Sequence, residues 1–130
     1  MSAISSPTPC KAMLIGGEWI NAGGERLISI NPATGQVNYE VCAAAPAHVE
    51  QAVAAAARAA RAPSWSGLLP HQRAAVLHRI AERMSANGER FAQLQMIENG
   101  KVWSECVAQV KSAAATFRYF AAVCETLGAE

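Results

Sequence analysis

The side chains of this sequence best suited to nucleophilic or metal chemistry are its cysteines and histidines. They are Cys10, Cys42, Cys106, Cys124, His48, His71 and His78. No two cysteines have the close spacing of zinc sites, and no histidine completes such a pattern. A catalytic cysteine also needs an activating base or dipole and a donor for the oxyanion, and none of the four has a local signature of either. The sequence therefore predicts no zinc site, four free thiols and no catalytic residue.

Two glycine pairs, Gly16-Gly17 and Gly23-Gly24, invite comparison with a phosphate-binding loop. Such a loop needs its glycines between a strand and the N-terminus of a helix, whereas both pairs lie between expected strands. Neither G-x-G-x-x-G nor G-x-x-x-x-G-K-[ST] occurs in the sequence. We therefore assign no cofactor-binding residue within the chain.

Glu98 stands directly before Asn99-Gly100-Lys101. Its carboxylate could serve as a base, as a ligand or as a solvated group at the end of a helix, and the residues around it favour the solvated group. Asn-Gly is typical of a helix end, because glycine adopts the left-handed conformation found there.

The charge balance excludes several classes of partner. Eleven Lys and Arg against ten Asp and Glu give a formal charge of +1, and the two signs alternate along the chain. Nucleic acid is not an expected partner, because no basic stripe forms. No run approaches the roughly 18 apolar residues of a membrane span, and the first residues lack the pattern of a secretory signal. The sequence predicts a soluble, cytoplasmic protein with no membrane partner.

The apolar content is high but consists largely of small side chains. Apolar residues make up 52% of the chain, and 28 of the 130 residues are alanine. Burying a methyl group stabilises a fold by about 0.8 kcal/mol, against about 1.5–3 kcal/mol for a Leu, Ile or Phe side chain. The helices must therefore pack closely together, or against something larger.

The N-terminal third predicts short antiparallel strands after a disordered tail over residues 1–10. Residues 13–15 and 18–20 flank the Gly16-Gly17 turn as a β-hairpin. Two further strands are expected over residues 26–30 and 36–42, separated by the turn sequence Asn31-Pro32-Ala33-Thr34-Gly35. Their open edges would need to be covered.

From His48 the apolar spacing becomes helical. One helix is expected up to Pro63, a second from Pro70 to Asn87-Gly88, a continuation to Asn99-Gly100, and a last helix over about residues 102–127. Buried parallel strands alternating with helices, which a dinucleotide-binding sheet requires, are absent from the pattern. The fold class is thus a segment of a larger α/β protein: an antiparallel strand unit followed by three or four helices.

Several motifs in order resemble the start of one enzyme family. They are LIGGEWI at residues 14–20, INPATG at 30–35, the alanine-rich residues 49–60, Trp65, Arg73 and ENGK at 98–101. Together they resemble the N-terminal segment of NAD(P)-dependent aldehyde dehydrogenases, from about Lys11 to Leu127. Val102, where members commonly have proline, and Leu69, where they commonly have a Ser or Thr N-cap, depart from the pattern. The resemblance makes residues 11–130 the incomplete N-terminal part of the family's cofactor-binding domain.

The resemblance implies oxidation of a small-molecule aldehyde to a carboxylic acid. In the family a cysteine forms a thiohemiacetal, a hydride passes to NAD or NADP, and a glutamate activates the water that hydrolyses the thioester. Those residues lie downstream of the segment that this chain resembles, so the chain alone is expected to be inactive. The implied partners are the remainder of an aldehyde dehydrogenase chain and, for the complete enzyme, further copies in a homo-oligomer.

The resemblance also implies a monovalent cation site. In some members Na⁺ or K⁺ lies between main-chain oxygens near the INP turn and the acidic residue before Asn-Gly-Lys or Thr-Gly-Lys; the matching positions are Ser29, Ile30 and Glu98. Hard cations favour such oxygen ligands. The alternative is that Glu98 faces water.

An alternative function is a non-catalytic helical interaction module that is derived from the family and binds a full-length relative. A reading frame that continues past codon 130 would indicate an enzyme, and a stop codon there would indicate a module.

Overall fold

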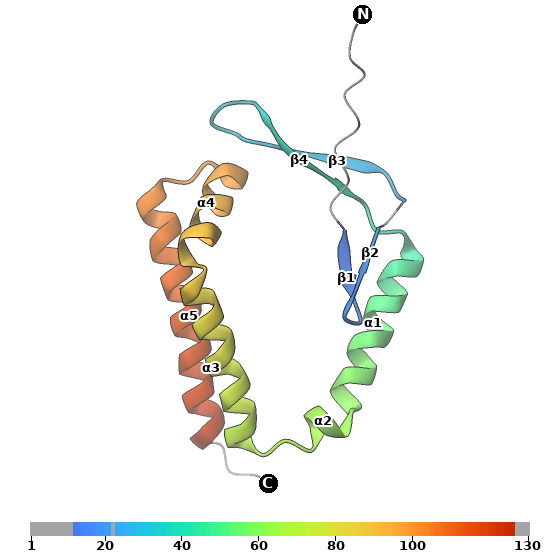
Figure 1. Ribbon diagram of the computed structural model, residues 1–130, viewed down its shortest axis with the longest axis vertical. Coiled ribbons are helices and arrows are strands. Elements are labelled where there is room, and N and C mark those ends of the chain that lie inside the picture. Colours follow the sequence, from blue (N-terminus) through green and yellow to red (C-terminus); the bar gives the residue numbers. More distant parts are fainter. Residues whose placement is uncertain (1–11, 22, 127–130) are drawn as a thin grey trace, which may run out of the picture. The chain divides into compact units, whose positions relative to one another are not determined.

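The computed structural model describes residues 12–21 and 23–126, so the predicted tail over residues 1–10 lies outside the described residues. The described residues divide into two compact units, with the boundary between Ala59 and Ala60. Figure 1 labels the strands and helices of both units. The first unit contains the strands and nearly all of the first helix, and the second contains the other helices. Each unit is described by itself below.

The first unit begins with the predicted β-hairpin. Strands β1 (Met13–Ile15) and β2 (Glu18–Ile20) are antiparallel, with Leu14 opposite Trp19. Gly16 and Gly17 have φ values of 62° and 94°. A two-residue hairpin turn with both φ values positive matches the right-handed twist of the strands, and glycine adopts it without strain.

Strands β3 (Arg26–Ile30) and β4 (Val37–Cys42) form a second, separate antiparallel pair. Strand β4 begins at Val37, one residue later than the start predicted from the sequence. The register is irregular at the end of β3, because Ser29 faces Tyr39 whereas Ile30 faces Val37. Asn31 closes the connecting turn: its side-chain oxygen accepts the Ala33 N–H at 2.9 Å, and its carbonyl accepts the Gly35 N–H at 2.8 Å.

Helix α1 (Pro46–Arg61) follows β4 and begins close to the predicted position. The Nδ1 atom of His48 accepts the Ala45 N–H at 3.1 Å. None of its residues is buried, and Val49 and Val53 are 54% and 63% exposed. The Ala55 side chain lies close to the β1–β2 turn, since a Cβ built on Gly16 would be 3.5 Å from it.

After the end of α1, residues 62–126 of the second unit form four helices, one of which the sequence does not predict. Pro63 does not only end α1; it also begins the short helix α2 (Pro63–Ser66), because proline is favoured in a first helical turn. The helices α3 (Pro70–Ala86), α4 (Gly88–Asn99) and α5 (Trp103–Thr126) agree with the predicted segments. Figure 1 shows α3 and α5 running side by side, and α5 also contacts α4.

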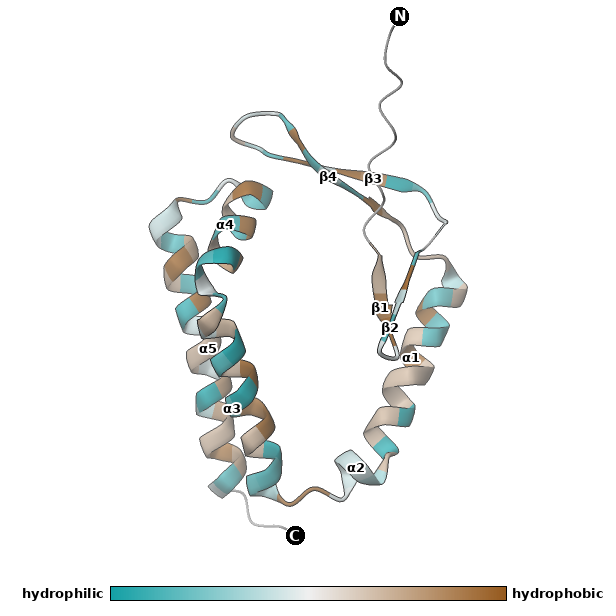
Figure 2. Ribbon diagram, in the orientation of Figure 1, coloured by the Kyte–Doolittle hydropathy of each residue, from teal (hydrophilic) through white to brown (hydrophobic). Residues whose placement is uncertain are grey.

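The core of the second unit is built mainly from methyl groups. Its fully buried residues, each at most 1% exposed, are Ala74, Ala81, Ala92, Cys106, Ala114 and Ala121. Larger apolar side chains remain open to solvent, including Ile80 at 37%, Phe91 at 42% and Phe120 at 54%. Figure 2 shows apolar and hydrophilic residues interspersed along α3, α4 and α5. Close helix packing through alanine therefore leaves the bulkier side chains outside the core.

Within residues 12–21 and 23–126, no helix combines the length and apolar character that a membrane crossing needs.

Candidate functional site

The two cysteines of the second unit occupy structural positions. Cys106 is fully buried, and its Sγ lies 3.9 Å from the carbonyl oxygen of Lys101. Cys124 is half-buried, and its thiol donates to the carbonyl oxygen of Pro70 at 3.4 Å. Both are free thiols directed at main-chain acceptors. Neither contact supplies the base or the cation that activates a nucleophilic cysteine.

Cys42, in contrast, is disulfide-bonded. The prediction of four free thiols is therefore wrong for this residue, although it holds for Cys106 and Cys124. The error has a simple physical origin: wide spacing along the sequence does not limit how closely two cysteines approach in space.

The first two predicted cation ligands lie at the irregular end of β3. Ser29 is half-buried, and its hydroxyl oxygen accepts a hydrogen bond from the Asn38 amide at 3.3 Å. Ile30 is the last residue of β3 and is 55% exposed. The break in register between them interrupts the regular ladder of main-chain hydrogen bonds.

The third predicted ligand, Glu98, lies in the last turn of α4 and is exposed. Gly100 ends the helix with φ 72° and ψ 14°, and its N–H donates to the Met96 carbonyl at 2.9 Å. Asn99 then accepts the Lys101 N–H on its side-chain oxygen at 3.1 Å. The predicted helix end is confirmed. Because Ser29 and Ile30 belong to the first unit and Glu98 to the second, the cation site stays a prediction.

Among residues 12–21 and 23–126, no three His, Cys, Asp or Glu side chains gather in a group that could hold a metal ion.

A cluster at the α2–α3 junction brings together two residues of the sequence pattern. The guanidinium of Arg73 lies over the Trp65 ring, 5.9 Å from its centroid. Its Nη2 donates to the Ser66 carbonyl at 3.2 Å. Sequence reasoning placed Trp65 and Arg73 only as members of a pattern and missed their contact, for which their eight-residue spacing around Pro70 is a weak signal.

The start of α3 shows how the chain manages without the usual cap. Leu69 has no side-chain oxygen, but its N–H donates to the Gln72 side chain at 2.8 Å, and the Gln72 N–H donates to the Leu69 carbonyl at 2.9 Å. This is half of a capping box, with the glutamine in its usual place.

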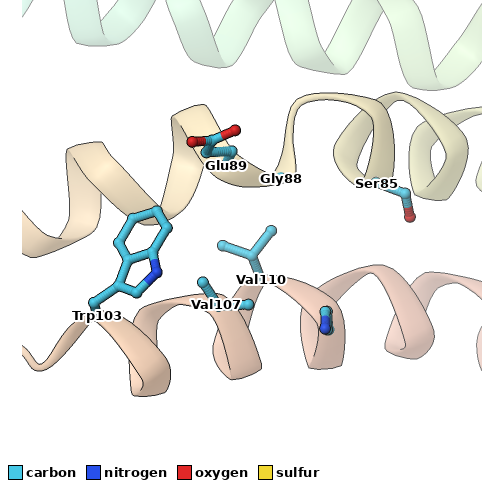
Figure 3. A pocket seen from close by; sticks show the side chains of 7 residues that line it. Ser85, Gly88, Glu89, Trp103, Val107 and Val110 are labelled. Carbon is cyan, nitrogen blue, oxygen red and sulfur yellow. The ribbon is translucent and has the colours of Figure 1, made fainter.

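One pocket of the second unit has a volume of about 510 Å³. It is lined by Ser85, Gly88, Glu89, Trp103, Val107, Val110 and Lys111. Figure 3 shows the indole and the two valines on α5, facing the start of α4. The walls are mostly apolar and contain neither cysteine nor histidine, so the pocket can hold an apolar group but offers neither a thiol nucleophile nor an imidazole base.

Comparison with known proteins identifies the family. The model of the "Aldehyde dehydrogenase family" matches residues 19–130. The chain belongs to the aldehyde dehydrogenase family.

Individual relatives agree with this assignment. The chain is 35% identical over 120 residues to aminoaldehyde dehydrogenase 2 of Solanum lycopersicum. This match covers 92% of this chain and 24% of the relative. It is 37% identical over 117 residues to betaine aldehyde dehydrogenase 1 of Rhizobium meliloti, covering 88% of this chain and 24% of the relative.

Solved structures show the same fold in this segment. A mutant of betaine aldehyde dehydrogenase from Staphylococcus aureus in complex with NAD⁺ matches 95% of this chain and 25% of its own, with 26% identity and a TM-score of 0.84. An aldehyde dehydrogenase mutant from Bacillus cereus matches 93% and 25%, with 28% identity and a TM-score of 0.86. This aldehyde dehydrogenase segment thus spans about a quarter of the length of these four relatives. The predicted fold of paired strands followed by helices is confirmed.

Proposed function

We propose that this chain forms the N-terminal quarter of an NAD(P)-dependent aldehyde dehydrogenase that oxidises an aldehyde to a carboxylic acid. The family match over residues 19–130 carries the proposal. The solved relative in complex with NAD⁺ favours NAD over NADP. The catalytic residues would lie in the part of the enzyme that corresponds to the other three quarters of the relatives.

The described residues themselves do not fit a nicotinamide cofactor. Such a cofactor binds at the carboxyl ends of parallel strands, with its pyrophosphate at the N-terminus of a helix. The strands described here pair only as antiparallel hairpins. Glycines with positive φ lie at hairpin turns and at the end of α4, not between a strand and a helix. The role we assign to this chain is therefore to complete the fold and not to hold the cofactor.

A chimera tests the proposal. Residues 19–130 would replace the matching segment of betaine aldehyde dehydrogenase 1 of Rhizobium meliloti, and formation of reduced cofactor would be followed with betaine aldehyde. We expect NAD-dependent turnover from the chimera and none from the same enzyme with the segment deleted. A chimera that folds but shows no turnover would contradict the proposed function.

The cation site is part of this proposal. Ser29 and Ile30 would contribute main-chain oxygens, and Glu98 a carboxylate, to a Na⁺ or K⁺ ion in the complete enzyme. The break in register after Ser29 supports it, because such a break leaves carbonyl oxygens outside the regular ladder. The chimera should be stabilised against heat by K⁺ or Na⁺ relative to tetramethylammonium, and Glu98→Gln should abolish that difference. An equal response to all three cations would exclude the site.

We also propose that the complete enzyme is a cytoplasmic homo-oligomer. One relative in the comparison, from Xenopus tropicalis, is named as a cytosolic 10-formyltetrahydrofolate dehydrogenase. Sedimentation of the chimera beside its parent enzyme tests whether this segment permits the parent's assembly.

A further inference from the structure

The start of α1 is capped by a histidine side chain. The Nδ1 atom of His48 accepts the Ala45 N–H at 3.1 Å, and the His48 N–H donates to the Ala45 carbonyl at 2.9 Å. Glutamate or glutamine has this place in the usual reciprocal cap. Ala45 has no side-chain oxygen, and Pro46 after it has no N–H. The imidazole therefore takes the capping role at this end of α1.

This cap exists only while the imidazole is neutral. A main-chain N–H can only donate, so Nδ1 must offer its lone pair and the ring proton must be on Nε2. After protonation both ring nitrogens are donors, and the Ala45 N–H loses its acceptor. The added positive charge is also unfavourable at the N-terminus of a helix, where the helix dipole is positive. Both effects destabilise the first turn of α1.

The charged groups near the cap do not offset this loss. The first turn of α1 contains no acidic residue. Glu50, the one carboxylate on the helix, is exposed, whereas Glu40 on β4 is already paired with Arg26. In the part of the chain that the structure describes, no carboxylate forms an ion pair with His48. The protonated imidazole would therefore gain no fixed partner.

Packing within the first unit does not compensate for a lost cap either. None of the residues of α1 is buried, and no strand of the unit packs extensively against the helix. Val49, next to His48, is 54% exposed. Helices in proteins are held mainly by the packing of an apolar face. With little of that packing here, loss of the hydrogen bond should appear directly as opening of the first turn.

We propose that His48 makes the start of α1 a pH-dependent switch. The neutral imidazole caps the helix, and as the pH falls through the range of histidine titration, about pH 8 to 5, the protonated ring releases the Ala45 N–H and the first turn opens. The Ala43 N–H donates to the Glu25 carbonyl at 2.7 Å and holds the end of β4. The opening is therefore confined to the link between β4 and α1, and it does not depend on the proposed enzyme activity.

Amide exchange of residues 45–50 in the chimera tests the inference, with each rate divided by that of an unstructured peptide at the same pH. We expect the corrected exchange to be at least about fivefold faster at about pH 5 than at about pH 8, because a helix cap is lost. His48→Gln should give slow exchange at both pH values, since glutamine accepts the same bond without titrating. His48→Ala should give fast exchange at both. His78→Gln, at an exposed position on α3, is the matched control and should keep the original pH dependence.

The outcomes separate the cap from general acid unfolding. Equal corrected exchange at both pH values, or a pH dependence that persists in His48→Gln, would overturn the proposal. Loss of the pH dependence in His78→Gln would also overturn it, because another histidine would then be responsible. If the chimera does not fold, the same comparison on the 130-residue chain decides, since the cap joins residues of a single turn. Turnover enters none of these outcomes, so a failure of the proposed function is recognised separately.

Discussion

At the scale of single residues, Gly24 has no room for a side chain. A Cβ built on it would collide with the carbonyl oxygen of Ala43. That main-chain contact is tight because the Ala43 N–H donates to the Glu25 carbonyl at 2.7 Å, where β4 ends beside the start of β3. Rigid backbone atoms lie on both sides, so neither side of the contact has a flexible side chain that could yield.

We therefore expect Gly24→Ala to destabilise the β3–β4 pair by about 1–3 kcal/mol. Amide exchange in the chimera measures this loss. Exchange of the β3 and β4 amides should be faster by at least about fivefold, because a loss of 1 kcal/mol changes the opening equilibrium constant by about that factor. Gly23→Ala is the control, because a Cβ on Gly23 meets nothing within 4 Å. Equal effects of the two changes would show that the contact with Ala43 is not tight.

Gly100 is constrained by its dihedral angles and not by its neighbours. Its φ of 72° lies in the left-handed region, which costs a residue with a Cβ about 1–2 kcal/mol. Gly100→Ala should therefore speed amide exchange in the last turn of α4 about fivefold or more. Gly100→Asn should have a smaller effect, because asparagine tolerates this region better than alanine. If alanine were tolerated as well as asparagine, the helix would not end as described.

Sequence analysis placed correctly those residues whose conformation is determined by their own type and by their immediate neighbours in the sequence. The Gly16-Gly17 turn and the Asn99-Gly100 helix end follow from backbone conformations that few other residues adopt. The disulfide of Cys42 and the contact of Arg73 with Trp65 depend on distances in space, which a single sequence does not contain. The cation site joins residues of two units and stays a prediction for the same reason.

At the scale of elements, the packing of α3 against α5 depends on alanine. Ala114 is 1% exposed on α5, whereas its neighbour Ala115 is exposed. Ala114→Leu should cost about 1–3 kcal/mol by overpacking, while Ala115→Leu adds the same side chain on the solvent side and should be nearly neutral. Amide exchange of α3 in the chimera distinguishes them. Comparable protection of α3 in both variants would mean that the two helices are not closely packed.

The elements that sequence analysis missed or misjudged are short. Helix α2 has only four residues, too few to show a helical period, so the sequence alone predicts Pro63 only as the stop of the preceding helix. The longer helices were predicted to within a residue or two, because their apolar spacing extends over several turns. The strands were also predicted, but their sorting into two separate sheets depends on pairing, which no local pattern specifies.

At the scale of the whole molecule, the chain buries few of its large apolar side chains. Apart from Cys106, every fully buried residue described is an alanine, whereas Trp19, Val53 and Tyr119 are 73%, 63% and 64% exposed. Methyl burial contributes about 0.8 kcal/mol per group, and ordering the backbone costs about 1–2 kcal/mol per residue. A stable fold then needs further polypeptide over the open faces, which fits a chain that spans a quarter of its relatives.

We therefore expect the 130-residue chain, purified alone, to be partly ordered or self-associating and to have neither tight NAD(P)⁺ binding nor aldehyde turnover. The first property follows from its exposed apolar faces and open strand edges. The second follows because the described residues offer neither an activated cysteine nor a strand–glycine–helix unit. Calorimetry with NAD⁺, an assay with a panel of aldehydes, sedimentation and thermal unfolding measure these properties. The chimera serves as the positive control for the assay. Turnover by the chain alone would overturn the assignment of catalysis to the rest of the enzyme, and a sharp unfolding transition of a monomer would favour the interaction module.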